Sequence, residues 1–202
     1  MLFDLTRGEL AALFGADRLA TVPATAFPPE AADTGGARLL RTVGAPTGTL
    51  LLRGSGEDGG RLPLVRDVVD VEDFEGVEDF EEAPEGAGAW PVIGWLLNAH
   101  LALDPGSGAV HAFDADEESV RQLHADVSSL VHVTLRFQHL LDSFAFGGGD
   151  DGEDEDFERL EDEVGRIVQE TSAIDPLPFE DDETLWSVIG EEIAMGQRFT
   201  GG

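Results

Sequence analysis

The sequence contains no cysteine and no lysine, and both absences limit what the protein can do. Without cysteine there are no disulfide bonds, no thiolate metal ligands and no cysteine nucleophile. The 12 basic residues are all arginines and stand against 42 acidic residues, so the formal net charge is −30. Phosphate backbones and anionic lipid heads repel such a chain, and we therefore expect no direct binding to nucleic acid or membranes. A partner protein with a basic surface is favoured instead.

Long apolar runs are also missing. None reaches the roughly 20 residues that a membrane-spanning helix needs. The first residues, Met1 to Asp4, lack the basic and then apolar pattern of a signal peptide, so we expect a cytoplasmic protein. With 202 residues and 42% hydrophobic content, the chain suits a single domain with its own core.

Motifs that carry catalysis are absent as well. No Gly-x-Ser-x-Gly pattern surrounds Ser128 and Ser129, which we interpret as helix caps rather than nucleophiles. There is no Gly-x-Gly-x-x-Gly pattern and no phosphate-binding loop. The five histidines lack metal-binding spacing; His132 and His139, seven residues apart, are interpreted as a structural or surface pair. The sequence therefore predicts a binding protein that is not an enzyme and has no cofactor, no metal and no catalytic residues.

The clearest structural pattern runs from Trp90 to Phe144. Asp104-Pro105-Gly106 separates two short apolar runs, and this turn chemistry predicts an antiparallel hairpin. Apolar residues then recur at helical spacing and predict one amphipathic helix over the strands. These residues are Val127, Leu130, Val131, Phe137, Leu141 and Phe144.

Elements on either side of this stretch complete the predicted fold. We expect helices over 2–14 and 30–43, a strand over 49–53 and one or two strands over 62–71. Two C-terminal helices follow, the second capped by Asp181 or Asp182 and ending near Gly196. Trp90 and Trp186 are predicted core residues. The predicted fold is α+β, a single domain with a mostly antiparallel central sheet of about five or six strands flanked by helices.

Residues 67–85, the first acidic region, carry ten carboxylates and no basic residue. One interpretation is a solvated insertion held by a few apolar residues. The other is an acidic platform on which aromatic side chains anchor a basic partner, since aromatics are typical of binding hot spots. On the second interpretation the candidate partner-binding residues are Asp70, Glu72, Asp73, Phe74, Glu75, Glu78, Asp79, Phe80, Glu81, Glu82 and Trp95.

Residues 150–163, the second acidic region, hold ten carboxylates in fourteen positions. A calcium loop beginning at Asp151 would place Asp156 where the essential glycine belongs, so an acidic calcium-binding protein is the least favoured alternative. Phe157, Leu160 and Val164 instead predict an amphipathic helix with an acidic first turn. We regard this region as the rival binding surface to the first acidic region.

Several ordered motifs resemble the immunity proteins of the SUKH superfamily, in particular its fourth, actinobacterial-type family. The match covers nearly the whole chain and is poorest in the two acidic regions. Val127 stands where the family often has Asn, and Ala45 where it usually has Leu. The matching motifs are Leu40-Arg41-Thr42-Val43-Gly44-Ala45-Pro46, Ile93-Gly94, Leu103-Asp104-Pro105, Gly108-Ala109-Val110, Ser128-Ser129-Leu130, Asp175-Pro176, Trp186 and Glu191-Glu192 followed by Gly196.

This resemblance implies an antitoxin that neutralises a polymorphic, nucleic-acid-targeting toxin by occluding its basic active-site groove. The alternative is a regulatory scaffold of the same fold that binds cellular partner proteins. The resemblance also implies a SUKH-like core over 1–146 with an acidic insertion at 67–85. An acidic, Gly-rich linker at 147–156 and C-terminal helices over 157–202 follow it. We expect a monomer or weak homodimer.

Overall fold

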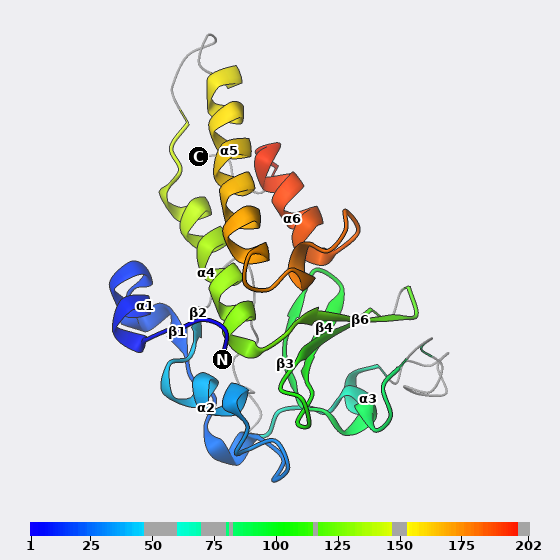
Figure 1. Ribbon diagram of the computed structural model, residues 1–202. Coiled ribbons are helices and arrows are strands. Elements are labelled where there is room, and N and C mark those ends of the chain that lie inside the picture. Colours follow the sequence, from blue (N-terminus) through cyan, green and yellow to red (C-terminus); the bar gives the residue numbers. More distant parts are fainter. Residues whose placement is uncertain (47–59, 70–79, 81–82, 115–116, 147–152, 198–202) are drawn as a thin grey trace.

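A four-stranded antiparallel sheet lies at the centre of the molecule, in the order β3-β4-β5-β6 (Figure 1). The computed structural model describes residues 1–46, 60–69, 80, 83–114, 117–146 and 153–197. The strands are β3 (Val92–Leu96), β4 (Ala99–Leu103), β5 (Val110–Asp114) and β6 (Ser119–His124).

The predicted turn joins β4 to β5. Asp104 fixes this turn because its Oδ1 accepts from the Gly106 N–H at 2.7 Å and its Oδ2 from the Ser107 hydroxyl at 2.5 Å. Gly108 supplies the positive φ, +83°, that closes the loop. The hairpin prediction is confirmed, with Leu103 paired to Val110.

Helix α4 (Val127–Ser143) covers one face of the sheet and forms the main core with it. Asp126 is the N-cap, and its Oδ1 accepts from the Ser129 N–H at 3.1 Å and from the Ser128 hydroxyl at 2.6 Å. Ser128 and Ser129 are therefore first-turn residues, and their assignment as caps was wrong by two or three positions. Ser128 serves another purpose, because its Oγ accepts from the Phe3 N–H at 3.0 Å.

Two C-terminal helices, α5 (Glu153–Ser172) and α6 (Leu185–Ala194), stack beside α4 (Figure 1). Trp186 joins them to the sheet: it is fully buried, and its ring stacks on Phe137 of α4 at 5.6 Å between centroids. Gly190 brings α5 and α6 close together, since a Cβ there would lie 3.2 Å from Cγ1 of Val164. Thr184, and neither predicted aspartate, is the N-cap of α6.

The N-terminal third packs against α4 through short elements. These are α1 (Arg7–Phe14), η1 (Ala16–Arg18), β1 (Leu19–Ala20), η2 (Ala24–Ala26), α2 (Gly35–Thr42) and β2 (Ala45–Pro46). Helix α2 begins at Gly35, later than expected, because Thr34 caps it by accepting from the Ala37 N–H at 3.1 Å. Strands β1 and β2 pair only with each other among the described residues.

A second hydrophobic cluster covers the opposite face of the sheet. Helix α3 (Val65–Val68) and η4 (Ala87–Ala89) place Val65, Phe80 and Ala87 against Ala102 and Phe113. The predicted strand over 62–71 was wrong for Val65–Val68: only Leu64 forms an isolated bridge, to Pro91.

The α+β prediction and the two C-terminal helices are confirmed; among the described residues the central sheet has four strands and the β1-β2 sheet two. Strand β6 went unpredicted because Ser119, Arg121 and Gln122 are exposed, so its sequence lacks an apolar alternation. The expected strand over 49–53 lies outside the described residues. Within the described ranges, no helix combines the length and apolar character needed to cross a bilayer.

Candidate protein-binding surface

The structure places only two of the predicted contact residues, Phe80 and Trp95. The remaining predicted contacts lie outside the described residues: Asp70, Glu72, Asp73, Phe74, Glu75, Glu78, Asp79, Glu81 and Glu82.

Phe80 belongs to the second hydrophobic cluster and not to the surface. Its side chain is 3% exposed, and its ring meets that of Phe113 edge to face at 5.9 Å between centroids. Trp90 approaches the same Phe113 ring at 6.2 Å. The sequence analysis listed Phe80 as an anchor that contacts the partner directly. The structure places it in the core instead, because the second face of the sheet needs an apolar cover.

Trp95 is half-buried on β3, an edge strand of the central sheet. It is paired across the ladder with His100, which in turn is paired with Phe113. Trp90 and Trp186, at 6% and 0% exposed, confirm the two core predictions.

A different set of aromatics, half-buried Phe144 and exposed Phe146 and Phe157, lies at the far end of the C-terminal helices. Phe144 and Phe146 follow α4, and their rings meet at 5.1 Å between centroids. Phe157 of α5 meets Phe146 at 6.3 Å. We call these three rings, together with Met195 at the end of α6, the distal apolar cluster. Sequence analysis missed it because its members come from three separate segments.

Gly196 brings these segments together. It lies at φ +72° just beyond α6, where a residue with a Cβ is disfavoured. A Cβ at Gly196 would lie 2.9 Å from Cε1 of Phe157 and 3.8 Å from Cζ of Phe146. The two rings therefore rest against bare backbone, which fixes their positions relative to α6.

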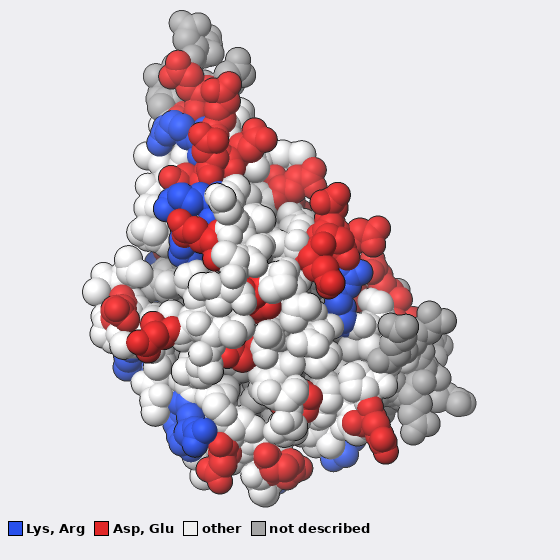
Figure 2. Space-filling model, viewed as in Figure 1, with Lys and Arg blue, Asp and Glu red and all other residues white. Residues whose placement is uncertain are grey.

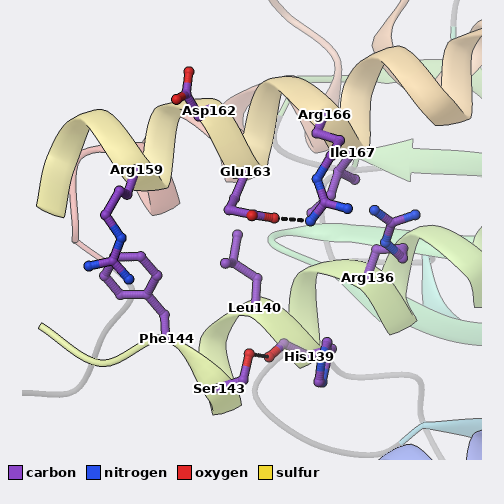
Figure 3. Close-up of a pocket in the computed structure, with 10 residues that line it drawn as sticks. All are labelled: Arg136, His139, Leu140, Ser143, Phe144, Arg159, Asp162, Glu163, Arg166 and Ile167. Carbon is purple, nitrogen blue, oxygen red and sulfur yellow. Dashed lines mark hydrogen bonds and ion pairs between the residues drawn. The ribbon is translucent and has the colours of Figure 1, made fainter.

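A groove of about 410 Å³ runs between α4 and α5 beside this cluster (Figure 3). Leu140, Phe144 and Ile167 give it an apolar lining. The other lining residues are polar or charged: Arg136, His139, Ser143, Arg159, Asp162, Glu163 and Arg166.

Each arginine of the groove has a carboxylate partner in this structure. Arg136 contacts Glu170 at 2.5 Å, and Arg159 contacts Asp156 at 2.6 Å. Arg159 also lies over the Phe144 ring, 4.8 Å from its centroid.

Arg166 pairs with Glu163, as the dashed line in Figure 3 shows. The Arg136 contact lowers the pKa of the Glu170 carboxyl by direct hydrogen bonding and by charge. The groove is thus internally neutralised and offers no free cationic set for an anion.

Carboxylates border the distal apolar cluster. Figure 2 shows carboxylates gathered along α5 toward its free end; a second group, at the linker before α6, lies at the other end of that helix. Glu155, Glu158 and Glu161 are exposed on α5, and Glu191 is exposed on α6. The arrangement is an apolar centre with an acidic rim, which is the composition of a protein-binding surface for a basic partner.

A Ser-His-Asp arrangement does occur, but it is buried. His124 Nδ1 lies 2.9 Å from the Ser129 hydroxyl and 3.9 Å from Asp175 Oδ2, while its Nε2 accepts from the Trp186 indole N–H at 2.7 Å. The four side chains are all between 0% and 1% exposed, so no substrate reaches them. Burial lowers the pKa of His124 to about 3, which keeps the ring neutral and able to accept from Trp186.

The polar contacts of Asp175 extend this buried network. Its Oδ2 accepts from the Ala125 N–H at 3.0 Å and its Oδ1 from the Leu177 N–H at 3.3 Å. The network therefore ties the β6–α4 corner to the α5–α6 connection. We assign it a structural role.

No group of three or more histidines, aspartates and glutamates is arranged to hold a metal ion within the part of the chain that the structure describes. His132 of the predicted histidine pair stacks on Phe3 at 4.1 Å between centroids. Burial, assisted by nearby Arg136, lowers its pKa to about 4.

Comparison with known proteins gives one match. The model of a protein family described as SUKH-4 immunity protein matches residues 5–192. No curated protein and no solved structure matches the chain.

Proposed function

Because this chain belongs to the SUKH-4 immunity protein family, we propose that it binds a cognate toxin and neutralises it without performing a reaction. The family match over residues 5–192 carries this proposal. The match spans both sides of the sheet and all three helices of the C-terminal stack, so the proposal concerns the whole fold and not one fragment.

The charge of the chain supports a basic partner. A toxin that acts on nucleic acid needs a positive surface to hold the phosphate backbone. An inhibitor with a formal net charge of −30 complements that surface and speeds the encounter through long-range attraction. We propose a nucleic-acid-targeting toxin on this ground.

Inhibition by occlusion fits the chemistry of the described residues. Their one Ser-His-Asp arrangement is sealed in the core. Neutralisation then consists of covering the toxin's basic substrate groove, so that the bound immunity protein and the nucleic acid exclude each other. The exposed carboxylates would occupy positions that phosphates otherwise take.

The first acidic region contributes to this field. Its ten carboxylates make it one of the two densest concentrations of negative charge in the sequence. Contacts from Asp70, Glu75 and Asp79 to the toxin stay a prediction from the sequence.

The test is co-expression with the protein encoded by the adjacent gene. We expect that protein to arrest growth alone and the arrest to disappear when this chain is co-expressed. The purified pair should form a complex on size exclusion, and its nuclease or deaminase activity should fall linearly to zero at one equivalent of this chain.

Two outcomes contradict the proposal. An adjacent product that is harmless, together with capture of a cellular regulator, favours the scaffold alternative. Protection without a complex, or protection at far below one equivalent, indicates catalysis instead of occlusion. A matched control is the Trp186→Ala variant, which removes a core side chain and should lose protection only as far as it loses folding.

A further inference from the structure

We propose that the distal apolar cluster, at the free end of α4, α5 and α6, is the docking point for the toxin and accepts an apolar side chain flanked by basic residues. This inference rests on the proposed function and adds to it the place of contact and the chemistry of the partner.

Exposure together with ring-to-ring contact separates Phe146 and Phe157 from the other exposed apolar residues. The exposed fractions are 45% for Phe146, 40% for Phe157 and 53% for Met195. Phe137, two helical turns before Phe144, is by contrast fully buried. Rings left in water while they touch one another form a ready apolar contact, and burying them under a partner is favourable. Single exposed residues elsewhere, such as Leu13 and Ile174, need no such explanation.

The cluster is also held in place before any partner arrives. Phe157 rests against Gly196, Phe146 lies between Phe144 and Phe157, and Arg159 lies over Phe144. Arg159 is in turn held by the buried Asp156 at 2.6 Å. Docking onto fixed rings loses little side-chain entropy, and this makes a small apolar surface effective.

The rim determines what kind of partner fits. On α5, Glu158 is next to Phe157 and Glu161 is one helical turn away, both exposed, and Glu191 is exposed on α6. Arginine or lysine side chains around the inserted apolar group would pair with these carboxylates. A second copy of this chain is a poor occupant, because it would bring the same carboxylates against each other in a molecule already at −30.

The adjoining groove strengthens the choice of a basic partner over an acidic one. Arg136, Arg159 and Arg166 each contact a carboxylate of α5. An acidic partner would have to displace those contacts, whereas a basic partner leaves them intact.

The experiment measures binding of a catalytically inactive form of the toxin encoded beside this gene. Phe146→Ala and Phe157→Ala together should raise Kd about 30-fold, the equivalent of one hot spot of about 2 kcal/mol, with most of the change in the dissociation rate. Met195→Ala should act in the same direction without disturbing the α5–α6 contact. The matched controls, Leu13→Ala and Ile174→Ala, remove side chains each 50% exposed and should leave Kd within about twofold.

The outcomes separate this surface from the function it serves. If the wild-type chain binds the toxin and the Phe146→Ala, Phe157→Ala and Met195→Ala variants bind equally well, the docking surface is wrong and the immunity function stands. If the wild-type chain binds no toxin, the proposed docking surface and the proposed immunity function are both wrong. If these variants change only self-association in ultracentrifugation, a second copy is the occupant and the proposal is overturned. Circular dichroism and urea unfolding of each variant show that a loss of binding is not a loss of folding.

Discussion

The two acidic regions contain the same number of carboxylates, ten each, and both include phenylalanine, yet they place those aromatic side chains differently. Phe80 of the first region is 3% exposed and packs on the sheet. Phe157 of the second is 40% exposed and lies at the end of a helix bundle. Phe80 is therefore part of the core, whereas Phe157 keeps much of its ring surface exposed.

The surrounding elements cause this difference. A sheet has two faces, and α4 with the C-terminal helices covers only one of them. The other face exposes Ala102 and Phe113 unless some segment covers them, and Phe80 is part of that cover. At the free end of the bundle no further element lies over Phe157 among the described residues.

The loss of unfolding free energy on replacing the fully buried Trp186 is the reference value for the two phenylalanines, Phe80 and Phe157. Trp186→Ala should cost about 5 kcal/mol, because it removes the stack on Phe137 and also leaves His124 Nε2 without its donor. Urea unfolding measures it. A loss below about 2 kcal/mol would mean that the C-terminal helices fold independently of the sheet.

The two phenylalanines should then differ sharply in stability. Phe80→Ala should cost about 3 kcal/mol of unfolding free energy, since it empties part of a closed cluster. Phe157→Ala should cost about 1 kcal/mol or less, since the side chain is largely in water. For toxin binding we expect the reverse order: Phe157→Ala should weaken the affinity more than Phe80→Ala does. If Phe80→Ala and Phe157→Ala lose the same unfolding free energy, the two phenylalanines do not differ in burial as described.

Acidification should weaken the core through its buried histidines. His124 has its pKa lowered from 6.5 to about 3 by burial, so between these values the unfolded chain takes up a proton that the folded chain excludes. Stability is therefore intact above pH 6.5 and falls as pH drops, by roughly 1.4 kcal/mol per pH unit, levelling off below about pH 3. His132, lowered to about 4, adds in the same direction.

The control for this pH effect is His124→Gln, which keeps a neutral acceptor for the Trp186 N–H. Urea unfolding from pH 7 to 4.5 should show a shallower slope for the variant than for the wild-type chain. Equal slopes for the variant and the wild-type chain would show that His124 does not cause the loss of stability at low pH.

Charge removal gives the smallest expected effect and tests the two regions as sources of the long-range field. Changing Glu75, Glu78, Asp79 and Glu81 to amides should slow association with the toxin several-fold at low salt. The matched set in the second region is Glu155, Glu158, Glu161 and Asp162. Both sets should leave the dissociation rate less affected than removal of Phe146 and Phe157.

Salt provides the check on that result. Association should slow as the screening length falls from about 30 Å at 0.01 M to about 10 Å at 0.1 M, and both amide sets should reduce this dependence. If the first set instead raises the dissociation rate more than the Phe146 and Phe157 changes do, docking occurs at the first acidic region.

How far the sequence predicts this structure depends on whether a pattern is local. The Asp104 turn, the apolar spacing of α4 and the burial of Trp186 follow from residues near each other in the chain, and all three are confirmed. Strand β6 has exposed side chains and so shows no such pattern. The distal apolar cluster could not be predicted, because Phe146 and Phe157 meet each other and Gly196 only through the packing of three segments.

Phe80 shows a further limit of sequence patterns. A phenylalanine among carboxylates is equally consistent with an exposed anchor and with an attachment to the core. Deciding between them requires knowing that the second face of the sheet lacks another cover. The apolar runs of β3, from Val92 to Leu96, and of β4, from Leu101 to Leu103, are the sequence signals that both faces of this sheet are buried.

The contacts at the start of α4 also determine when the protein can finish folding during synthesis. The Leu2 N–H donates to Asp126 at 2.8 Å and the Phe3 N–H to Ser128 at 3.0 Å, so the first residues made must wait for a partner more than 120 positions later. Trp186 reaches His124 from the other end of the chain. Contacts of such long sequence separation form slowly, because a large loop must close before they contribute. A nascent chain that has not yet reached α6 has neither Trp186 over its sheet nor a donor for His124, so the core stays incomplete until α6 has been made.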